Sequence, residues 1–334
     1  MTDTMPPERN ARHKILRAMP WVVKLLISSA LLWYLLRTVN LAEAVERAKA
    51  LSATHIVGAF ILVCAQVVLG GLRWKFVLSA IGARLTMAKS VSITFVSLFF
   101  NQFLPASVGA DLVRVWQSSR AGLLLTTAVT SVMLERFGNL LCVVAMALAV
   151  LPFWGRHVQS DSTRDVFILI GMAGVVALAM LMFLDRLPYA WRRWRIVRGI
   201  ASLARDTRSL FLHPVWASLL IVTAVAAQVM LAAAVHLVAL GLGLDIKFID
   251  CLVLMPPVVL VSALPISVAG WGVRELAMVT AFGMLSVPPD SALALSIVMA
   301  LTATAVSLPG GVIWLWSRSE PSANAPGQTT KTPP

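Results

Sequence analysis

The 334-residue chain is far more apolar than a soluble protein. Hydrophobic residues make up 59% of it and charged residues 13%, with a mean hydropathy of +0.84, whereas soluble domains contain roughly 45–50% apolar residues. The net charge of +13 would suit nucleic acid, but the basic residues lie mostly in connections between apolar runs. Cytoplasmic retention and anionic lipid headgroups explain basic residues in such places. The composition therefore predicts a membrane protein and excludes a soluble or nucleic-acid-binding one.

Six apolar runs approach or exceed the roughly 20 residues needed to cross a bilayer. They cover residues 21–39, 56–77, 123–151, 166–184, 215–242 and 291–316. Residues 91–104 and 251–264 are apolar over a stretch too short for a span, and each is expected to be a half-helix. Two further short apolar pieces, 108–120 and 276–287, raise the total to eight crossings or re-entrant legs. We therefore expect an all-α fold, a polytopic transmembrane helix bundle of six to eight spans within residues 21–316. Residues 1–20 form a basic N-terminal segment, and residues 317–334 form a tail that we expect to be disordered.

Lysine and arginine are unevenly distributed among the connections. The N-terminal segment, the 73–90 connection and the 186–208 connection are basic, whereas 152–165 and 243–250 carry little net positive charge. Because basic loops stay in the cytoplasm, we expect an inner or plasma membrane protein with both termini cytoplasmic. The 186–208 segment alternates aromatic residues with arginines, which is typical of an interfacial amphipathic helix. A loop that only sets the topology is the alternative.

Two proline-containing motifs in the chain match each other. Leu104 to Arg114 and Leu264 to Arg274 agree at six of eleven positions without a gap, and each follows a half-length apolar run. With the orientation above, the first element (91–120) enters from the cytoplasm and the second (251–287) from outside. This pattern is typical of an inverted-topology repeat, in which broken helices meet near the midplane. A simple proline kink where two helices pack is the alternative.

The residue types at these breaks suit an anion-binding site. A proline lacks the backbone N–H and ends the incoming half-helix, and a serine can cap the helix that follows. Helix N-termini favour anions such as phosphate, and glycine allows close backbone approach. The candidate residues of the breaks are Pro105, Ser107, Gly109, Pro265, Ser267, Gly270 and Gly272.

Charged residues lie beside both breaks and within the 123–151 run. An ion at the centre of a span costs about 2.5–3.5 kcal/mol, so we expect these side chains to face one polar cavity, or else to form a structural network or lie at the interface. Asp111 and Arg114 are three residues apart and can pair locally. Sequence neighbours should point apart and find partners elsewhere. The candidate residues are Asp111, Arg114, Glu135, Arg136, Arg274 and Glu275, with Asn101 just before the first break.

At these residues the chain resembles the lysylphosphatidylglycerol synthase transmembrane family of flippase-like membrane proteins. The family pattern N-x-x-x-P-x-x-x-G-x-D-x-x-R is met from Asn101 to Arg114, and P-x-S-x-x-G-x-G-x-R-E is met in full from Pro265 to Glu275. An acidic-Arg pair followed by glycine is matched at 135–138, although the family glycine commonly lies one position later. Two glycines often seen in the first motif are alanines here, at positions 106 and 110. The resemblance covers about residues 20–316.

The resemblance implies a lipid-translocating membrane region. Family members that aminoacylate lipids carry a large soluble catalytic domain after the membrane region, and the chain leaves no room for one after Trp316. We therefore expect a lipid flippase or scramblase rather than an enzyme, with no cofactor and no metal. Its expected partners are membrane lipids, anionic or zwitterionic, with a homo-oligomer or lipid-biosynthesis enzymes left open.

Two other functions remain open from the sequence. One is a membrane-embedded transferase acting on a lipid-linked substrate, with Asp111, Glu135 or Glu275 as the base. The other is a non-transporting scaffold that recruits lipid-modifying enzymes. Two polar residues of the 215–242 run, Gln228 and His236, are expected to be helix contacts or pathway residues.

Overall fold

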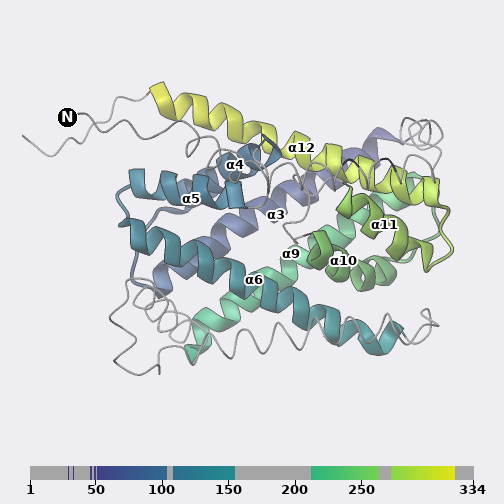
Figure 1. Ribbon diagram of the computed structural model, residues 1–334, viewed down its shortest axis with the longest axis horizontal. Coiled ribbons are helices and arrows are strands. Elements are labelled where there is room, and N and C mark those ends of the chain that lie inside the picture. Colours follow the sequence, from purple (N-terminus) through teal and green to yellow (C-terminus); the bar gives the residue numbers. More distant parts are fainter. Residues whose placement is uncertain are drawn as a thin grey trace, which may run out of the picture.

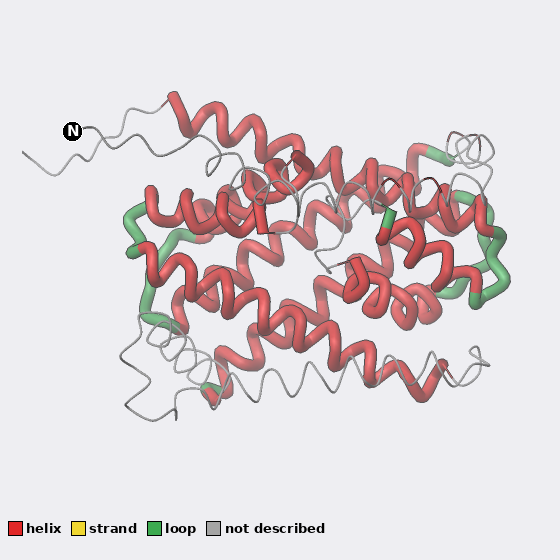
Figure 2. Tube along the Cα trace, in the orientation of Figure 1, coloured by secondary structure: helices red, strands yellow, loops and turns green. Residues whose placement is uncertain are grey.

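The computed structural model describes residues 51–103, 108–154, 212–262 and 272–319, together with the isolated positions 29, 33, 46 and 49. All regular structure within the four described ranges is α-helical (Figure 2). The helices are α3 (Ala53–Ala80), α4 (Met87–Phe103), α5 (Val108–Arg120), α6 (Leu125–Trp154), α9 (Pro214–Gly241), α10 (Phe248–Ser262), α11 (Val273–Gly283) and α12 (Pro289–Ser319). The all-α polytopic bundle expected from the sequence is confirmed.

Four of the described helices, α3, α6, α9 and α12, are long and apolar enough to cross a membrane. They coincide with four of the six apolar runs. Their outward surfaces carry large exposed side chains such as Ile61, Val222 and Leu308, which suits contact with lipid tails rather than water. The expected spans at 21–39 and 166–184 lie outside the described residues, as do the 186–208 segment and both ends of the chain.

Each Leu-Pro motif falls between two helices. The helix before the first motif, α4, has 17 residues, and the helix before the second, α10, has 15. At 1.5 Å per residue both helices fall short of a bilayer core of about 30 Å. The residues of the breaks, 104–107 and 263–271, lie outside the described residues. Half-length helices at both places are confirmed, whereas the re-entrant path and the inverted repeat stay predictions.

The longest contact in the bundle joins α3 and α9, which cross its middle in opposite directions between α12 and α6 (Figure 1). The direction follows from two close approaches: a Cβ on Gly58 would lie 3.0 Å from Leu237 Cδ1, and one on Gly241 would lie 3.0 Å from His55 Cβ. The end of α9 therefore packs on the start of α3. The connection that leads into α4 and the connection that leads into α10 consequently lie at opposite ends of α3.

The main core is built from small and medium-sized apolar side chains. Its largest cluster joins α3, α4, α9, α10, α11 and α12. Ala59, Ala232 and Val235 in this cluster have no exposed surface. Small residues let helices approach closely, which is how packing replaces the hydrophobic effect in a membrane. The closest approach lies between α12 and α4, where a Cβ on Gly310 would overlap the carbonyl group of Phe95.

Candidate functional site

A cavity of about 900 Å³ lies among the eight described helices, and each of them contributes to its lining. Most of the lining is apolar, from side chains such as Val67, Leu231 and Val258. The cavity is therefore amphipathic, with a charged group set against an apolar wall. The charged side chains that line it are Arg73, Asp111, Arg114, Glu135, Arg136 and Arg274.

The centre of the charged group is Glu135 on α6, which is 4% exposed. Its Oε1 accepts hydrogen bonds from Arg73 Nε at 2.8 Å and from Arg73 Nη2 at 2.5 Å. Its Oε2 accepts one from Arg114 Nη1 at 2.8 Å. One carboxylate thus joins guanidiniums from α3 and α5. Charge-assisted pairs of this kind are strong when they are buried and well aligned.

The guanidinium of Arg114 has two further contacts that fix its position. Its Nη2 donates to Thr94 Oγ1 at 3.3 Å, and its Cζ lies 5.1 Å from the centroid of the Trp74 ring. The indole Nε1 of Trp74 donates in turn to Ser131 Oγ at 3.2 Å. A cation over an indole face is stabilised by the ring quadrupole. The arginine, which lies on α5, is therefore held by residues of three other helices, α3, α4 and α6.

The second ion pair joins Asp111 on α5 to Arg136 on α6. The aspartate side chain is 10% exposed and the arginine side chain 40% exposed, so this pair lies nearer the surface than Glu135. The local pairing of Asp111 with Arg114 that the sequence suggested is wrong. Each of them instead binds a residue of α6, because the face of α5 that carries both packs against that helix.

The third ion pair lies at the start of α11. Arg274 Nη2 donates to Glu275 Oε1 at 2.7 Å, and the backbone N–H of Gly272 donates to Glu275 Oε2 at 2.6 Å. The expectation that Arg274 and Glu275 point apart is therefore wrong. Glu275 turns back to the first turn of its own helix, where a carboxylate is favoured. Gly272 has φ +85°, a conformation that other residues seldom adopt.

The remaining candidates fall into two groups. Asn101 lines the cavity, and Gly109 and Gly272 are buried at the starts of α5 and α11. The other five candidates, Pro105, Ser107, Pro265, Ser267 and Gly270, lie outside the described residues. The structure thus brings together the charged residues of both motifs and does not describe the prolines and serines of the breaks.

Arg73 is the residue of the charged group that the sequence analysis missed. We counted it with the basic 73–90 connection, but it lies inside α3 and is 8% exposed. Arg73 was missed because it stands beside Trp74 and Lys75, a group that a basic connection near the membrane surface explains. No acidic residue nearby in the sequence indicated a partner for it. Without Arg73, the expected cytoplasmic position of both termini depends on the other basic residues of the connections and on the N-terminal and 186–208 segments.

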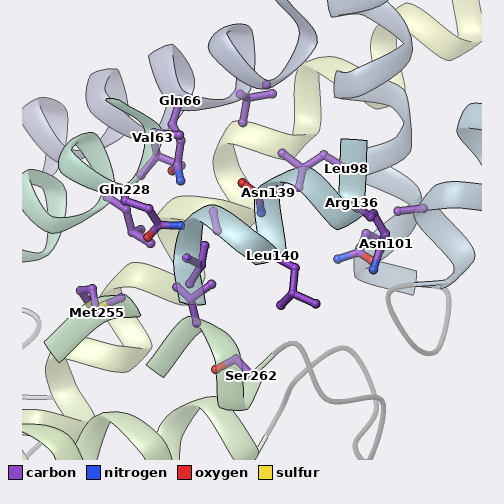
Figure 3. Close-up of a pocket in the computed structure, with 18 of the residues that line it drawn as sticks. Val63, Gln66, Leu98, Asn101, Arg136, Asn139, Leu140, Gln228, Met255 and Ser262 are labelled. Atoms are coloured by element: carbon purple, nitrogen blue, oxygen red, sulfur yellow. The ribbon is translucent and has the colours of Figure 1, made fainter. Parts of the chain in front are cut away.

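An uncharged polar wall completes the cavity. Gln66 of α3 and Gln228 of α9 lie near each other in Figure 3, away from Asn101 and Arg136, with Asn139 between the two groups. Gln228 is 4% exposed, and its Oε1 has no hydrogen-bond partner among the described residues. Its position favours the reading of Gln228 as a pathway residue. His236 does not line the cavity and contacts the Phe248 ring instead.

Long apolar helices packed around a cavity lined by ion pairs define a polytopic integral membrane protein with a charged central chamber. The family model described as the lysylphosphatidylglycerol synthase TM region matches residues 21–311. The chain therefore belongs to this family, as its sequence motifs indicated. A search of curated proteins finds no match.

Proposed function

We propose that the protein moves a lipid across the bilayer, with the headgroup in the charged cavity and the acyl chains against the apolar lining or in the surrounding lipid. The observation that carries the proposal is the cavity itself. Four arginines from four different helices, α3, α5, α6 and α11, line one chamber of about 900 Å³. Charges at membrane depth are costly and generally mark a pathway for a polar substrate.

The chemistry of the chamber suits a phosphate-bearing headgroup. Guanidinium groups bind phosphate oxygens through two parallel hydrogen bonds, and they hold their charge at any physiological pH. The helices that begin near the cavity, α5 and α11, add the positive ends of their dipoles. These groups would replace the water that a headgroup loses on entering the membrane.

The transferase alternative is less well supported. A general base needs a carboxylate that is free to accept a proton from the substrate. Asp111, Glu135 and Glu275 each accept from at least one arginine in the structure. The scaffold alternative depends on the 186–208 segment, which lies outside the described residues.

The test is transport of acyl-labelled fluorescent phospholipids in proteoliposomes, followed by dithionite bleaching of the outer leaflet. We expect the wild-type protein to expose inner-leaflet lipid and Arg114→Ala to slow this at least tenfold. The fold should survive because Glu135 keeps its two hydrogen bonds from Arg73. Arg120→Ala is the matched control, since Arg120 lies on the same helix but is exposed, near Trp116 and outside the cavity.

Two results would reject the proposal. One is a correctly inserted wild-type protein that moves none of the labelled lipids. The other is an Arg114→Ala protein that inserts normally and transports at the wild-type rate.

A further inference from the structure

Among the described residues, the charged side chains of the cavity do not balance. Four guanidiniums line it, and three carboxylates pair with them, namely Asp111, Glu135 and Glu275. One positive charge is therefore left over in the described lining. Residues 104–107 and 263–271, which connect the lining helices, contain no charged side chain that could cancel it.

The excess charge is located at one cluster. The Asp111–Arg136 and Arg274–Glu275 pairs are each neutral, whereas Glu135 alone serves both Arg73 and Arg114. The Arg73–Glu135–Arg114 cluster thus carries the extra positive charge. A buried charge that lacks a partner is costly, so an anion in the cavity would be stabilised at this cluster in particular.

An unused hydrogen-bond donor lies at the same place. Arg73 Nη1 is buried and has no hydrogen-bond partner among the described residues, although Nε and Nη2 of the same side chain both donate to Glu135. Arg73 is 8% exposed and lines the cavity. Because a buried donor without a partner is unfavourable, this N–H is suited to an oxygen of a bound anion.

The described lining offers no free carboxylate to a cationic headgroup. A buried charge is stabilised chiefly by an oppositely charged partner. The three carboxylates of this region are already bonded to guanidiniums, and Glu135 uses both of its oxygens. A lipid amine would have to break one of these pairs, and it would also meet the excess positive charge.

The uncharged wall offers partners for hydroxyl groups instead. Besides Gln228 Oε1, the Oγ of Ser296 is buried without a hydrogen-bond partner among the described residues, and both residues line the cavity. Ser296 has 0% exposure. A carbonyl oxygen that accepts and a hydroxyl that both donates and accepts are the complement of an alcohol.

We infer that the cavity selects a lipid with one phosphodiester and a neutral, hydroxyl-bearing headgroup, of the glycerol-phosphate or sugar-phosphate kind, and disfavours amine-bearing lipids. The phosphodiester binds at the Arg73–Glu135–Arg114 cluster, with Arg73 Nη1 as a donor. The headgroup hydroxyls bind along the wall of Gln228 and Ser296. This inference rests on the proposed function and narrows its substrate class.

The experiment compares headgroups on the purified full-length protein. Binding of short-chain phosphatidylglycerol, phosphatidylethanolamine and phosphatidylcholine is measured in detergent, with soluble glycerol 3-phosphate as a separate arm. Transport of the same three lipids, labelled on the acyl chain, is measured in phosphatidylcholine vesicles. We expect phosphatidylglycerol to bind and move at least tenfold better than either zwitterionic lipid, and glycerol 3-phosphate to bind more weakly than phosphatidylglycerol because it lacks the chains.

A pair of variants tests the charge of the cluster. Arg73→Gln keeps the Arg114–Glu135 pair but removes the excess charge, so the preference for phosphatidylglycerol should fall at least tenfold. The double variant Arg73→Gln with Glu135→Gln restores the single positive charge on Arg114, so part of the preference should return. A purely structural role for Arg73 does not predict this return. Arg84→Gln, at an exposed position in the connection after α3, is the control.

The outcomes separate this inference from the proposed function. Equal binding and transport of all three lipids, or a preference for phosphatidylethanolamine, would overturn the inference while leaving lipid transport standing. Absence of transport for every lipid would reject the proposed function itself. If the double variant does not give a monodisperse protein, the comparison of wild type with Arg73→Gln decides: an unchanged preference overturns the inference.

Discussion

Glu135 is the residue on which the charged cluster depends. Its carboxylate is bonded to guanidiniums from two other helices and is almost completely buried. The Asp111–Arg136 pair has the same chemistry, but its arginine side chain is 40% exposed. Burial decides how much each carboxylate matters, because removing one partner of a buried pair leaves the other charge unpaired at a cost of about 3–5 kcal/mol. Exposed pairs contribute about 0–1 kcal/mol.

At the residue scale we therefore predict a large difference between two similar substitutions. Glu135→Gln should lower the thermal unfolding temperature in detergent strongly, because Arg73 and Arg114 lose their shared counterion. Asp111→Asn should lower it much less, because water reaches Arg136. Thermal unfolding followed by size-exclusion chromatography measures both. Equal losses for the two variants would contradict the ranking.

The sequence predicted most of the charged residues that line the cavity, but neither their pairing nor Arg73. Asp111, Arg114, Glu135 and Arg136 stand out because a charge in an apolar run is rare. Their pairing could not be read from the sequence, because partners on different helices depend on how those helices pack. Arg73 was hidden for the opposite reason: at the end of an apolar run, an arginine resembles a topology signal.

At the scale of elements, the apolar runs predicted helices well where length and composition alone decide the outcome. The 108–120 piece is helix α5 with the same limits, and the 251–264 piece is α10 within a few residues. The sequence did not indicate that α10 continues through Pro256 and Pro257, which are both buried inside it. Proline usually ends a helix, so only the surrounding packing could reveal this continuation.

The contact between α4 and α12 gives a prediction at this scale. Gly310→Val should destabilise the protein by about 1–3 kcal/mol or more, because any side chain there forces the two backbones apart. The reason is the overlap of an added Cβ with the carbonyl group of Phe95. Gly283→Ala is the matched control, since a Cβ there meets no heavy atom within 4 Å.

Thermal unfolding of the two variants, measured side by side in one detergent, decides between packing and helix propensity. Of the two substitutions, only Gly310→Val should lower the unfolding temperature. A similar change for both substitutions would show that the approach of α4 to α12 does not limit stability.

At the scale of the whole molecule, the two broken elements begin at opposite ends of the bundle. The connection before α4 follows the end of α3, and the connection before α10 follows the end of α9, which packs on the start of α3 (Figure 1). The spans that carry these ends are long enough to cross the bilayer. This arrangement supports the inverted-topology prediction, for which the sequence offered a pairing of motifs but no spatial relation between them.

The last prediction places these two connections on opposite sides of the membrane. Arg84 and Asp245 are both exposed, one in each connection, so a cysteine at either position should react with a membrane-impermeant maleimide from one side only. The background is a chain in which the three native cysteines, Cys64, Cys142 and Cys251, are replaced by alanine. From the basic N-terminal and 186–208 segments, we expect Asp245→Cys to be labelled in intact cells and Arg84→Cys only after permeabilisation. Labelling of both from the same side would contradict an inverted repeat, because the broken helices would then enter the bilayer from one face and their arginines could not converge from opposite leaflets.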